Sequence, residues 1–351
     1  MGNSSSNWQP QPLAPVLEQP EILTAVAQSL PGAAATRKSA AYWAWKHVDN
    51  PFGRSGGTFG RADDGDIVGV RSFMRWGWRT SDGQALRAVR AVDTSTSPDW
   101  RGKGVFTRLT LAAIEELKRE GVDLIFNTPN SASGPGYVKM GWQSVGTMPL
   151  SLRPIRPFRL LRGMLKRGGA DDRLPDPADF GLGELPSASQ WLSDPAAMDL
   201  VDSHEKSRSV LGLRTPRDRN YLDWRYARHP QVPYRVHVME LDGAPAAVAV
   251  VRPNWRFGLR ELVVTELFAR DARRDLLRRC LGSLARVGRP DYLITHFAKG
   301  SVELAAARRA GFLPAPGQGI GLYARHVEAA LSAQLLAPSG WDLSLGDLEL
   351  F

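Results

Sequence analysis

A pattern that occurs twice is the feature of this 351-residue sequence that most restricts its fold. The segment Trp45-Lys-His-Val-Asp-Asn-Pro51 has a counterpart in Trp224-Arg-Tyr-Ala-Arg-His-Pro230. Both contain a tryptophan, a basic residue, three variable positions, Asn or His, and a proline, and the features that follow correspond at a separation of roughly 170–180 residues. Self-similarity of this kind indicates a structural unit that the chain contains twice.

Each copy continues with the same order of predicted elements. An apolar strand and a second strand precede an amphipathic helix, a short apolar strand, and a helix that ends at a Gly-aromatic pair. In the first copy these features are at 67–70, 86–92, 106–118, 124–126 and 141–142, and in the second at 246–251, 262–267, 276–286, 292–294 and 311–312. Strands that alternate with helices in this way predict α/β domains built around a sheet.

The chain is long enough for two domains, since an average domain has roughly 100–200 residues. We therefore expect an α/β (α+β) protein with two tandem domains, each with a central mixed sheet flanked by helices. The predicted division is a disordered tail at 1–20, a first domain at 21–150, a Pro/Gly-rich connector at 151–200, a second domain at 201–327, and a C-terminal tail at 328–351. Within this tail, residues 341–351 could add an edge strand.

The formal net charge of +9 is compatible with a polyanionic partner such as a nucleotide cofactor, nucleic acid or anionic lipid. Arginines are spread along the chain instead of being clustered with aromatic residues, so we expect no nucleic-acid partner. The one cysteine, Cys280, excludes an intrachain disulfide, and its apolar helical surroundings predict a buried thiol. The six histidines have no metal-binding spacing, so no metal site is predicted.

The N-terminal sequence lacks a basic segment followed by an apolar run, so we expect no signal peptide and a cytoplasmic protein. No apolar stretch approaches the roughly 18 residues that a transmembrane helix needs. Met1-Gly2-Asn-Ser-Ser-Ser6 fits the loose pattern for N-myristoylation, although a disordered polar tail is the interpretation that we prefer.

The segment 153–167 mixes six basic residues with large apolar side chains. One interpretation is a basic amphipathic helix that lies on an anionic membrane surface. The interpretation that we prefer is an interdomain helix that packs Leu161 and Leu165 onto its neighbours.

We predict the functional site at the junction of a strand and a helix. The strand ends in Thr94-Ser-Thr-Ser97, and Arg101-Gly-Lys-Gly104 leads from it into the helix. Glycines at alternate positions let the backbone approach a ligand without interference from a Cβ atom. The N–H groups of the first helical turn, together with the helix dipole, form an anion site suited to a pyrophosphate. Arg101 and Lys103 add positive charge beside that site.

Two motifs in this region resemble those of a known superfamily. Pro98-Asp-Trp-Arg-Gly-Lys-Gly-Val-Phe106 resembles motif A of the GCN5-related N-acetyltransferases (GNAT), with Phe106 where many members have a small residue. Asn130, Tyr137 and Lys139-Met-Gly-Trp142 resemble the Asn…Tyr-x-Lys-x-Gly-Phe signature of that superfamily. The unusual Gly134-Pro-Gly136 between them is expected to bend or delay the helix. The resemblance covers roughly residues 38–150.

The resemblance implies a splayed sheet and acetyl-CoA as the acyl donor. The backbone amides that would hold the pyrophosphate belong to Arg101, Gly102, Lys103, Gly104, Val105, Phe106 and Thr107. The strand edge at Thr94, Ser95 and Thr96 would pair with the pantetheine arm, and its N–H groups would stabilise the oxyanion.

By the same resemblance, Tyr137 would protonate the leaving thiolate. The alternative is that Tyr137 is a core aromatic residue. Asn130 would contact the cofactor or act as a helix N-cap, and the two roles are compatible. No general base stands out, and Asp93 is expected to be a surface carboxylate.

The second copy lacks the glycine loop. At the corresponding place the chain reads Arg270-Asp-Ala-Arg-Arg-Asp275, and its acidic residues would repel a pyrophosphate. We therefore expect a degenerate copy that binds no acyl-CoA. Tandem members of the superfamily with one active and one inactive copy include the mycothiol synthases and the enhanced-intracellular-survival type.

These features favour an acetyltransferase that acts on an amine, or a hydroxyl, of a small or sugar-like acceptor, such as an amino sugar or a nucleotide sugar. One alternative is an aminoacyl-tRNA-dependent transferase of the cell-wall peptide-bridge kind, although those proteins do not typically depend on an Arg-Gly-x-Gly loop. Another alternative is a non-catalytic module that senses acyl-CoA. The sequence does not determine the oligomeric state.

Overall fold

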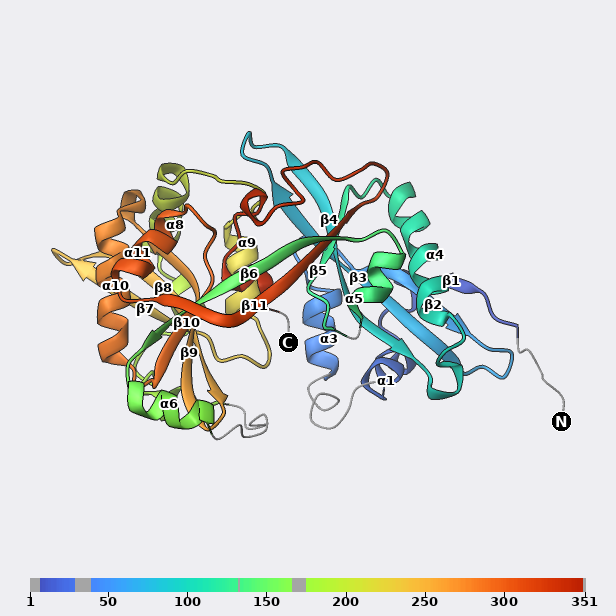
Figure 1. The fold of residues 1–351 in the computed structure, drawn as a ribbon, viewed down its shortest axis with the longest axis horizontal. Helices are drawn as coiled ribbons and strands as arrows, with labels where there is room; N and C mark the ends of the chain where they lie inside the picture. The colour runs from blue at the N-terminus through green and yellow to red at the C-terminus, as the bar shows by residue number, and fades with distance from the viewer. Residues whose placement is uncertain (1–6, 29–38, 132, 166–174, 350–351) are drawn as a thin grey trace. The chain divides into compact units, whose positions relative to one another are not determined.

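The computed structural model describes residues 7–28, 39–131, 133–165 and 175–349. The chain divides into two compact units (Figure 1). The first unit comprises Met1–Gly146 and Gly321–Leu336, and the second comprises Thr147–Ile320 and Ala337–Phe351. In the described part of the chain, no helix is both long and apolar enough to cross a membrane.

The sheet of the first unit has the strand order β1-β2-β3-β4-β5-β11. Its strands are β1 (Pro10–Pro12), β2 (Gly56–Arg61), β3 (Ile67–Arg79), β4 (Ala85–Thr96), β5 (Leu124–Asn127) and the end of β11 (Leu313–His326). Neighbouring strands are antiparallel except β4 and β5, which are parallel. The parallel pair is possible because α4 (Val105–Arg119) connects its two strands.

Helices cover both faces of this sheet (Figure 1). On one face, α1 (Pro20–Gln28) and α3 (Ala40–His47) share a core with Val70 of β3. On the other face, α4 and α5 (Gly134–Lys139) share a core with Phe73 of the same strand. Helix α4 is amphipathic, and its buried Leu109, Ala113, Ile114 and Leu117 follow the helical period.

The prediction of a disordered tail at 1–20 is wrong for its described part. Residues 10–12 form β1 on the edge of β2, and Leu13 and Leu17 are fully buried near the short 3₁₀ helix Ala14–Val16. The segment is ordered because these apolar side chains join the core between α1 and the sheet. The N-myristoylation pattern lies outside the described residues.

The sheet of the second unit has the order β6-β10-β9-β8-β7. Its strands are β6 (Gln143–Pro154), β7 (Arg235–Leu241), β8 (Ala244–Arg256), β9 (Leu259–Ala269) and β10 (Tyr292–Thr295). Its helices are α6 (Pro157–Leu165), α7 (Ala188–Leu192), α8 (Pro195–Ser207), α9 (Arg219–Leu222), α10 (Arg274–Val287), α11 (Val302–Arg309) and α12 (Leu345–Leu348). The predicted α/β class, with mixed sheets flanked by helices, is confirmed in both units.

The two units repeat one pattern of strand pairing. In each, two antiparallel pairs precede a parallel pair whose strands are connected by a helix, α4 in the first unit and α10 in the second. The last strand of each copy, however, lies in the other unit. Residues 151–154 of β6 pair with β10, and residues 323–326 of β11 pair with β5. This reciprocal exchange moves the unit boundaries away from the predicted limits at 150 and 327.

Two predicted loop regions contain regular structure. The connector 151–200 includes the end of β6, α6, α7 and part of α8. In the C-terminal tail, the short helix α12 replaces the edge strand that we considered, and Trp341, Leu343, Leu345 and Leu348 are buried in the second unit. These four apolar side chains explain why the segment packs instead of forming a free tail.

The preferred interpretation of the basic segment is also wrong. It forms α6 as expected, but Leu161 and Leu165 do not pack onto neighbours, because their side chains are 61% and 77% exposed. Cys280 is buried as predicted, and burial raises the pKa of its thiol to about 12.

Candidate functional site

A strand edge without a partner is the main feature of the first unit. Strands β4 and β5 pair only over Ala88–Arg90 and Leu124–Phe126. Strand β4 continues to Thr96, past a bulge at Asp93, whose φ is 41°. On the side facing β5, its segment 91–96 therefore has no paired strand among the described residues. The predicted pantetheine-binding residues Thr94, Ser95 and Thr96 all lie on this segment.

The glycine loop follows this edge and leads directly into α4. Gly102 and Gly104 have φ of 74° and 75°, the left-handed region that glycine adopts without strain. A Cβ atom at either position would meet nothing within 4 Å, so the space beside the loop is open to a ligand. Arg101 and Lys103 are exposed there, whereas Val105 is buried and Phe106 is half-buried.

A cavity of about 640 Å³ lies at the end of β4. This volume is within the range of small-molecule sites. Its lining comes from the end of β4 and the residues after it, from α1, and from the start of β3: Ser95, Thr96, Ser97 and Pro98; Glu21, Thr24, Ala25 and Gln28; Asp66 and Ile67. Two of the predicted cofactor residues, Ser95 and Thr96, therefore face an open cavity.

Tyr137 lies on α5, next to the helix that follows the loop. Its ring meets the Phe106 ring edge-on at 5.5 Å and the Trp142 ring at 5.2 Å, and its side chain is almost buried. Gly134-Pro-Gly136, which we expected to bend or delay the helix, forms the first turn of α5. Tyr137 thus packs in the core, and it also contacts α4, the helix that follows the glycine loop.

Asn130 caps the turn before α5. Its side-chain oxygen accepts the N–H of Ser133 at 2.9 Å, and its carbonyl accepts the N–H of Gly134 at 3.0 Å. These are the hydrogen bonds of an N-cap, one of the two roles that we considered, but they cap the turn that precedes α5, whose own N-cap residue is Ser133.

Arg71 on β3 is a residue that the sequence did not point to. It is fully buried, and its Cζ lies 4.6 Å, 5.5 Å and 5.3 Å from the ring centres of Phe73, Phe106 and Tyr137. Its Nη1 donates to the Thr94 hydroxyl, whereas Nε and Nη2 have no hydrogen-bond partner in the described part of the chain. Burial lowers the pKa of this guanidinium. The result is a buried cation with unused donors beside the open edge of β4.

Asp93 is not the surface carboxylate that we expected. Its side chain is 4% exposed and forms ion pairs with Lys46 at 2.6 Å and His47 at 3.0 Å. His47 also contacts the Ser55 hydroxyl at 2.8 Å. Lys46 and His47 belong to the repeated Trp-basic motif, so the motif anchors the bulge of β4. In the sequence, the repeat marks Lys46 and His47 as part of a recurring motif, but it does not show that their partner is Asp93.

Comparison with known proteins bears on the family of the first unit. Residues 23–145 match the family model of an acetyltransferase (GNAT) domain. The chain contains a GNAT domain. The match includes the open edge of β4, the glycine loop and Tyr137. No curated protein matches the sequence.

Several solved structures are similar to the chain over 92% of its length. One is a GCN5-related N-acetyltransferase from Anabaena variabilis, with 10% identity and a TM-score of 0.60 over 73% of that chain. A probable N-acyltransferase from Enterococcus faecalis has 12% identity and a TM-score of 0.59, also over 73%. Eis1 from Mycobacterium abscessus has 15% identity and a TM-score of 0.53 over 74%. At these identities the likeness concerns the fold.

The place in the second unit that corresponds to the open edge of the GNAT domain is filled. Strands β9 and β10 pair only over residues 261–263 and 292–294, and β9 has a bulge at Thr265. The C-terminal segment occupies the space beyond, because Ser344 bridges to Phe297 and donates to Glu266 at 2.9 Å. The cavity that remains measures about 20 Å³, close to the space of one water molecule.

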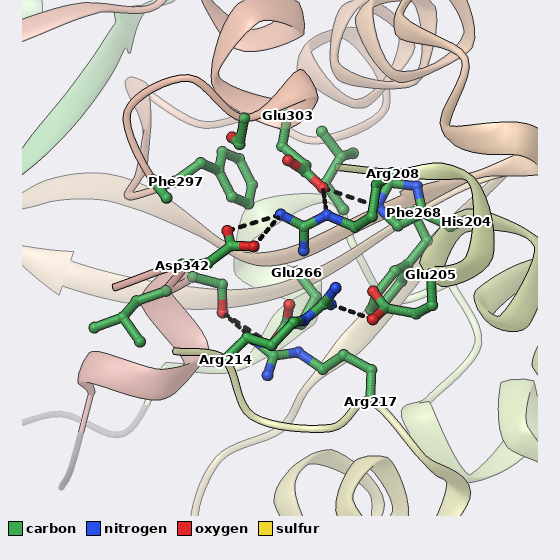
Figure 2. Close-up of a pocket in the computed structure, with 15 residues that line it drawn as sticks. His204, Glu205, Arg208, Arg214, Arg217, Glu266, Phe268, Phe297, Glu303 and Asp342 are labelled. Atoms are coloured by element: carbon green, nitrogen blue, oxygen red, sulfur yellow. Dashed lines mark hydrogen bonds and ion pairs between the residues drawn. The ribbon is translucent and has the colours of Figure 1, made fainter. Parts of the chain in front are cut away.

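Ionic side chains line this filled place (Figure 2). Arg217 contacts Asp347 at 2.7 Å and Glu266 at 3.0 Å. Arg208 contacts Asp342 at 2.8 Å and Glu303 at 3.2 Å. Burial opposes ionisation of Glu303, but Arg208 and His204 lower the pKa of its carboxyl to about 2. Each of these arginines forms direct ion pairs with carboxylates, whereas Arg71 is attracted by Asp93 but forms no ion pair with a carboxylate of the described residues.

The loop before α10 also differs from the glycine loop of the GNAT domain. Asp271 and Ala272 have φ of 54° and 50°, a conformation that costs energy for residues with a Cβ atom. Asp271 exchanges hydrogen bonds with Ser203, and Asp275 pairs with Arg273 at 2.8 Å. Acidic side chains thus lie where a pyrophosphate would need positive charge.

Proposed function

We propose that this protein transfers an acetyl group from acetyl-CoA to an amine, or a hydroxyl, of a small or sugar-like acceptor. The observation that carries the proposal is the open edge of β4, which continues into a glycine loop and the N-terminus of α4. An extended strand edge suits the amide groups of a pantetheine arm, and a helix N-terminus suits a pyrophosphate. Residues 101–107 and 94–96 are the groups that would hold the donor.

The reaction requires that the acceptor attack the acyl carbon and that the carbon–sulfur bond break. In our proposal, N–H groups of β4 stabilise the oxyanion that forms, and Tyr137 donates its proton to the departing sulfur. The acceptor loses its own proton to solvent water, and solvent returns a proton to the phenol. Arg71 supports this assignment, because its unused N–H groups are donors for the negative charge that develops on the sulfur or the phenol.

We also propose that the second unit is a degenerate copy that binds no acyl-CoA. Its strand edge is covered by its own C-terminal segment, and its loop lacks glycine and carries acidic residues. The donor would therefore bind once per chain, in the GNAT domain.

Measuring CoA release from acetyl-CoA across a panel of amines, amino sugars and nucleotide sugars tests the function. At least one acceptor should give acceptor-dependent release. A ligand at 100 times its Kd should also stabilise the native state by about 2.7 kcal/mol in a thermal-shift screen. Stabilisation by acetyl-CoA without release for any acceptor would instead favour an acyl-CoA-sensing module.

A further inference from the structure

Helix α6 carries an exposed apolar stripe. Phe158, Leu161 and Leu165 are 88%, 61% and 77% exposed, which places them among the most exposed large apolar side chains of the described residues. They lie at positions i, i+3 and i+7, so they share one face of the helix. Most exposed apolar residues are isolated, whereas these three form a continuous row on a nine-residue helix.

The opposite face of α6 is fixed to the second unit. Gly163 lies so close to Leu259 at the start of β9 that a Cβ atom on it would be 2.6 Å from the leucine side chain. Arg156 and Arg159 point to the buried Asp291, with Nη1 to Oδ1 distances of 3.9 Å and 3.4 Å. Since α6 is held by this face, its apolar stripe is directed away from the unit to which it is attached. Figure 1 shows α6 at the periphery of the second unit.

Positive charge borders the stripe. The segment 153–167 contains six basic residues and no acidic residue. Arg162 is exposed directly beside the stripe, and Arg156 and Arg159, although they contact Asp291 on the attached face, have side chains that are still 41% and 50% exposed. A partner must therefore accept apolar side chains and carry negative charge around them.

We propose that α6 binds the surface of an anionic membrane. A helix with Phe and Leu on one face and arginines beside them matches the pattern of helices that lie in the plane of the lipid headgroups. With nine residues it is far shorter than the roughly 20 that would span a bilayer, so it lies on the membrane. Phe158, Leu161 and Leu165 enter the acyl boundary, and Arg162 beside them contacts lipid phosphates. The proposal is independent of the acetyltransferase function.

Co-sedimentation of the full chain with lipid vesicles tests this proposal. We expect binding to vesicles of phosphatidylcholine mixed with phosphatidylglycerol, little binding to phosphatidylcholine alone, and weaker binding as salt increases. Replacing all three apolar residues, as in Phe158→Ser with Leu161→Ser and Leu165→Ser, should reduce the bound fraction about tenfold or more. Arg162→Glu should reduce binding to the mixed vesicles to a smaller extent.

Leu313→Ser is the matched control, because Leu313 is also 61% exposed but lies at the start of β11. It should bind vesicles as the wild type does. The replaced side chains are already exposed, so the triple variant should unfold at the wild-type temperature, and loss of binding would not reflect misfolding. Equal binding of wild type and triple variant, or equal binding to both kinds of vesicle, would overturn the proposal. So would self-association in solution that the triple variant abolishes while the wild type ignores lipid.

Discussion

The two units use one strand arrangement for opposite purposes. In both, a strand with a bulge runs past its short parallel neighbour and leaves an edge. In the GNAT domain this edge is open and continues into the glycine loop. In the second unit, residues 342–347 cover it and a network of ion pairs surrounds it. The same framework thus gives a candidate ligand site where the chain leaves the edge free and a structural core where the chain fills it.

The buried arginines show the same difference. Arg217 of the second unit is buried between Asp347 and Glu266, which raise the pKa of its guanidinium well above the usual value although burial opposes this. Arg71 of the GNAT domain is equally buried, and burial lowers the pKa of its guanidinium. A buried charge with acidic partners supports the fold, whereas one with unused donors indicates a place for a ligand.

The largest effect is expected at the open loop. Gly104→Asp would add bulk and a negative charge at the N-terminus of α4, and we expect it to abolish acetyl-CoA binding, a loss on the order of a thousandfold or more. Calorimetry should give one site per chain for the wild type and none for the variant. Arg274→Asp, at the exposed start of α10, is the matched control and should leave binding unchanged. Two sites per chain would show that the second unit is not degenerate.

Tyr137→Phe should lower turnover and leave acetyl-CoA affinity near that of the wild type. The phenylalanine keeps the ring contacts with Phe106 and Trp142 and removes only the hydroxyl. Loss of a general acid typically lowers turnover on the order of 10²–10⁴-fold. Steady-state kinetics with a direct acetyl-CoA titration measures both quantities. Turnover within about twofold of the wild type would leave Tyr137 a core aromatic residue only.

Arg217→Met should destabilise the second unit. It would leave Glu266 and Asp347 buried without their cation, and breaking a buried ion pair costs about 3–5 kcal/mol. Urea unfolding should reveal this loss. The control is Arg273→Met, which removes an exposed ion pair with Asp275 and should leave the urea concentration at the unfolding midpoint unchanged. An unchanged transition in Arg217→Met would mean that the ionic network does not stabilise the filled edge.

Local patterns explain what the sequence could predict. The repeat, the glycine loop and the α/β class depend on residues close together in the chain, and all are recognisable in it. The exchange of β6 and β11 depends on pairing between residues far apart, such as Tyr323 with Asn127, and no local pattern contains it. Arg71 was missed for the same reason, because a charged residue in a strand gives no sign of burial until Phe106 and Tyr137 fold over it.

Acid should weaken the second unit through Glu303. The pKa of its carboxyl is about 2 in the folded protein, below its ordinary value, so ionisation of Glu303 stabilises the fold above the ordinary carboxyl range. That contribution should be lost as the pH falls from about 4.5 to about 2. Unfolding experiments as a function of pH should show a shallower loss of stability for Glu303→Gln than for the wild type. A parallel loss in both proteins would assign acid sensitivity to other carboxylates.

The smallest effect on stability is expected for Arg71→Met, and it tests the comparison between the units most directly. Methionine fills a similar apolar space among Phe73, Phe106 and Tyr137. It removes a guanidinium whose burial is only partly offset by attraction to Tyr137 and Asp93, and whose Nε and Nη2 have no hydrogen-bond partner in the described residues. The free energy of unfolding should therefore change by less than about 1 kcal/mol or increase. Acyl transfer should fall about tenfold or more, because a charge-assisted hydrogen bond contributes about 1.5–3 kcal/mol. If Arg71→Met were instead as destabilising as Arg217→Met, Arg71 would be a structural cation like those of the second unit, and its donors would no longer argue for a ligand.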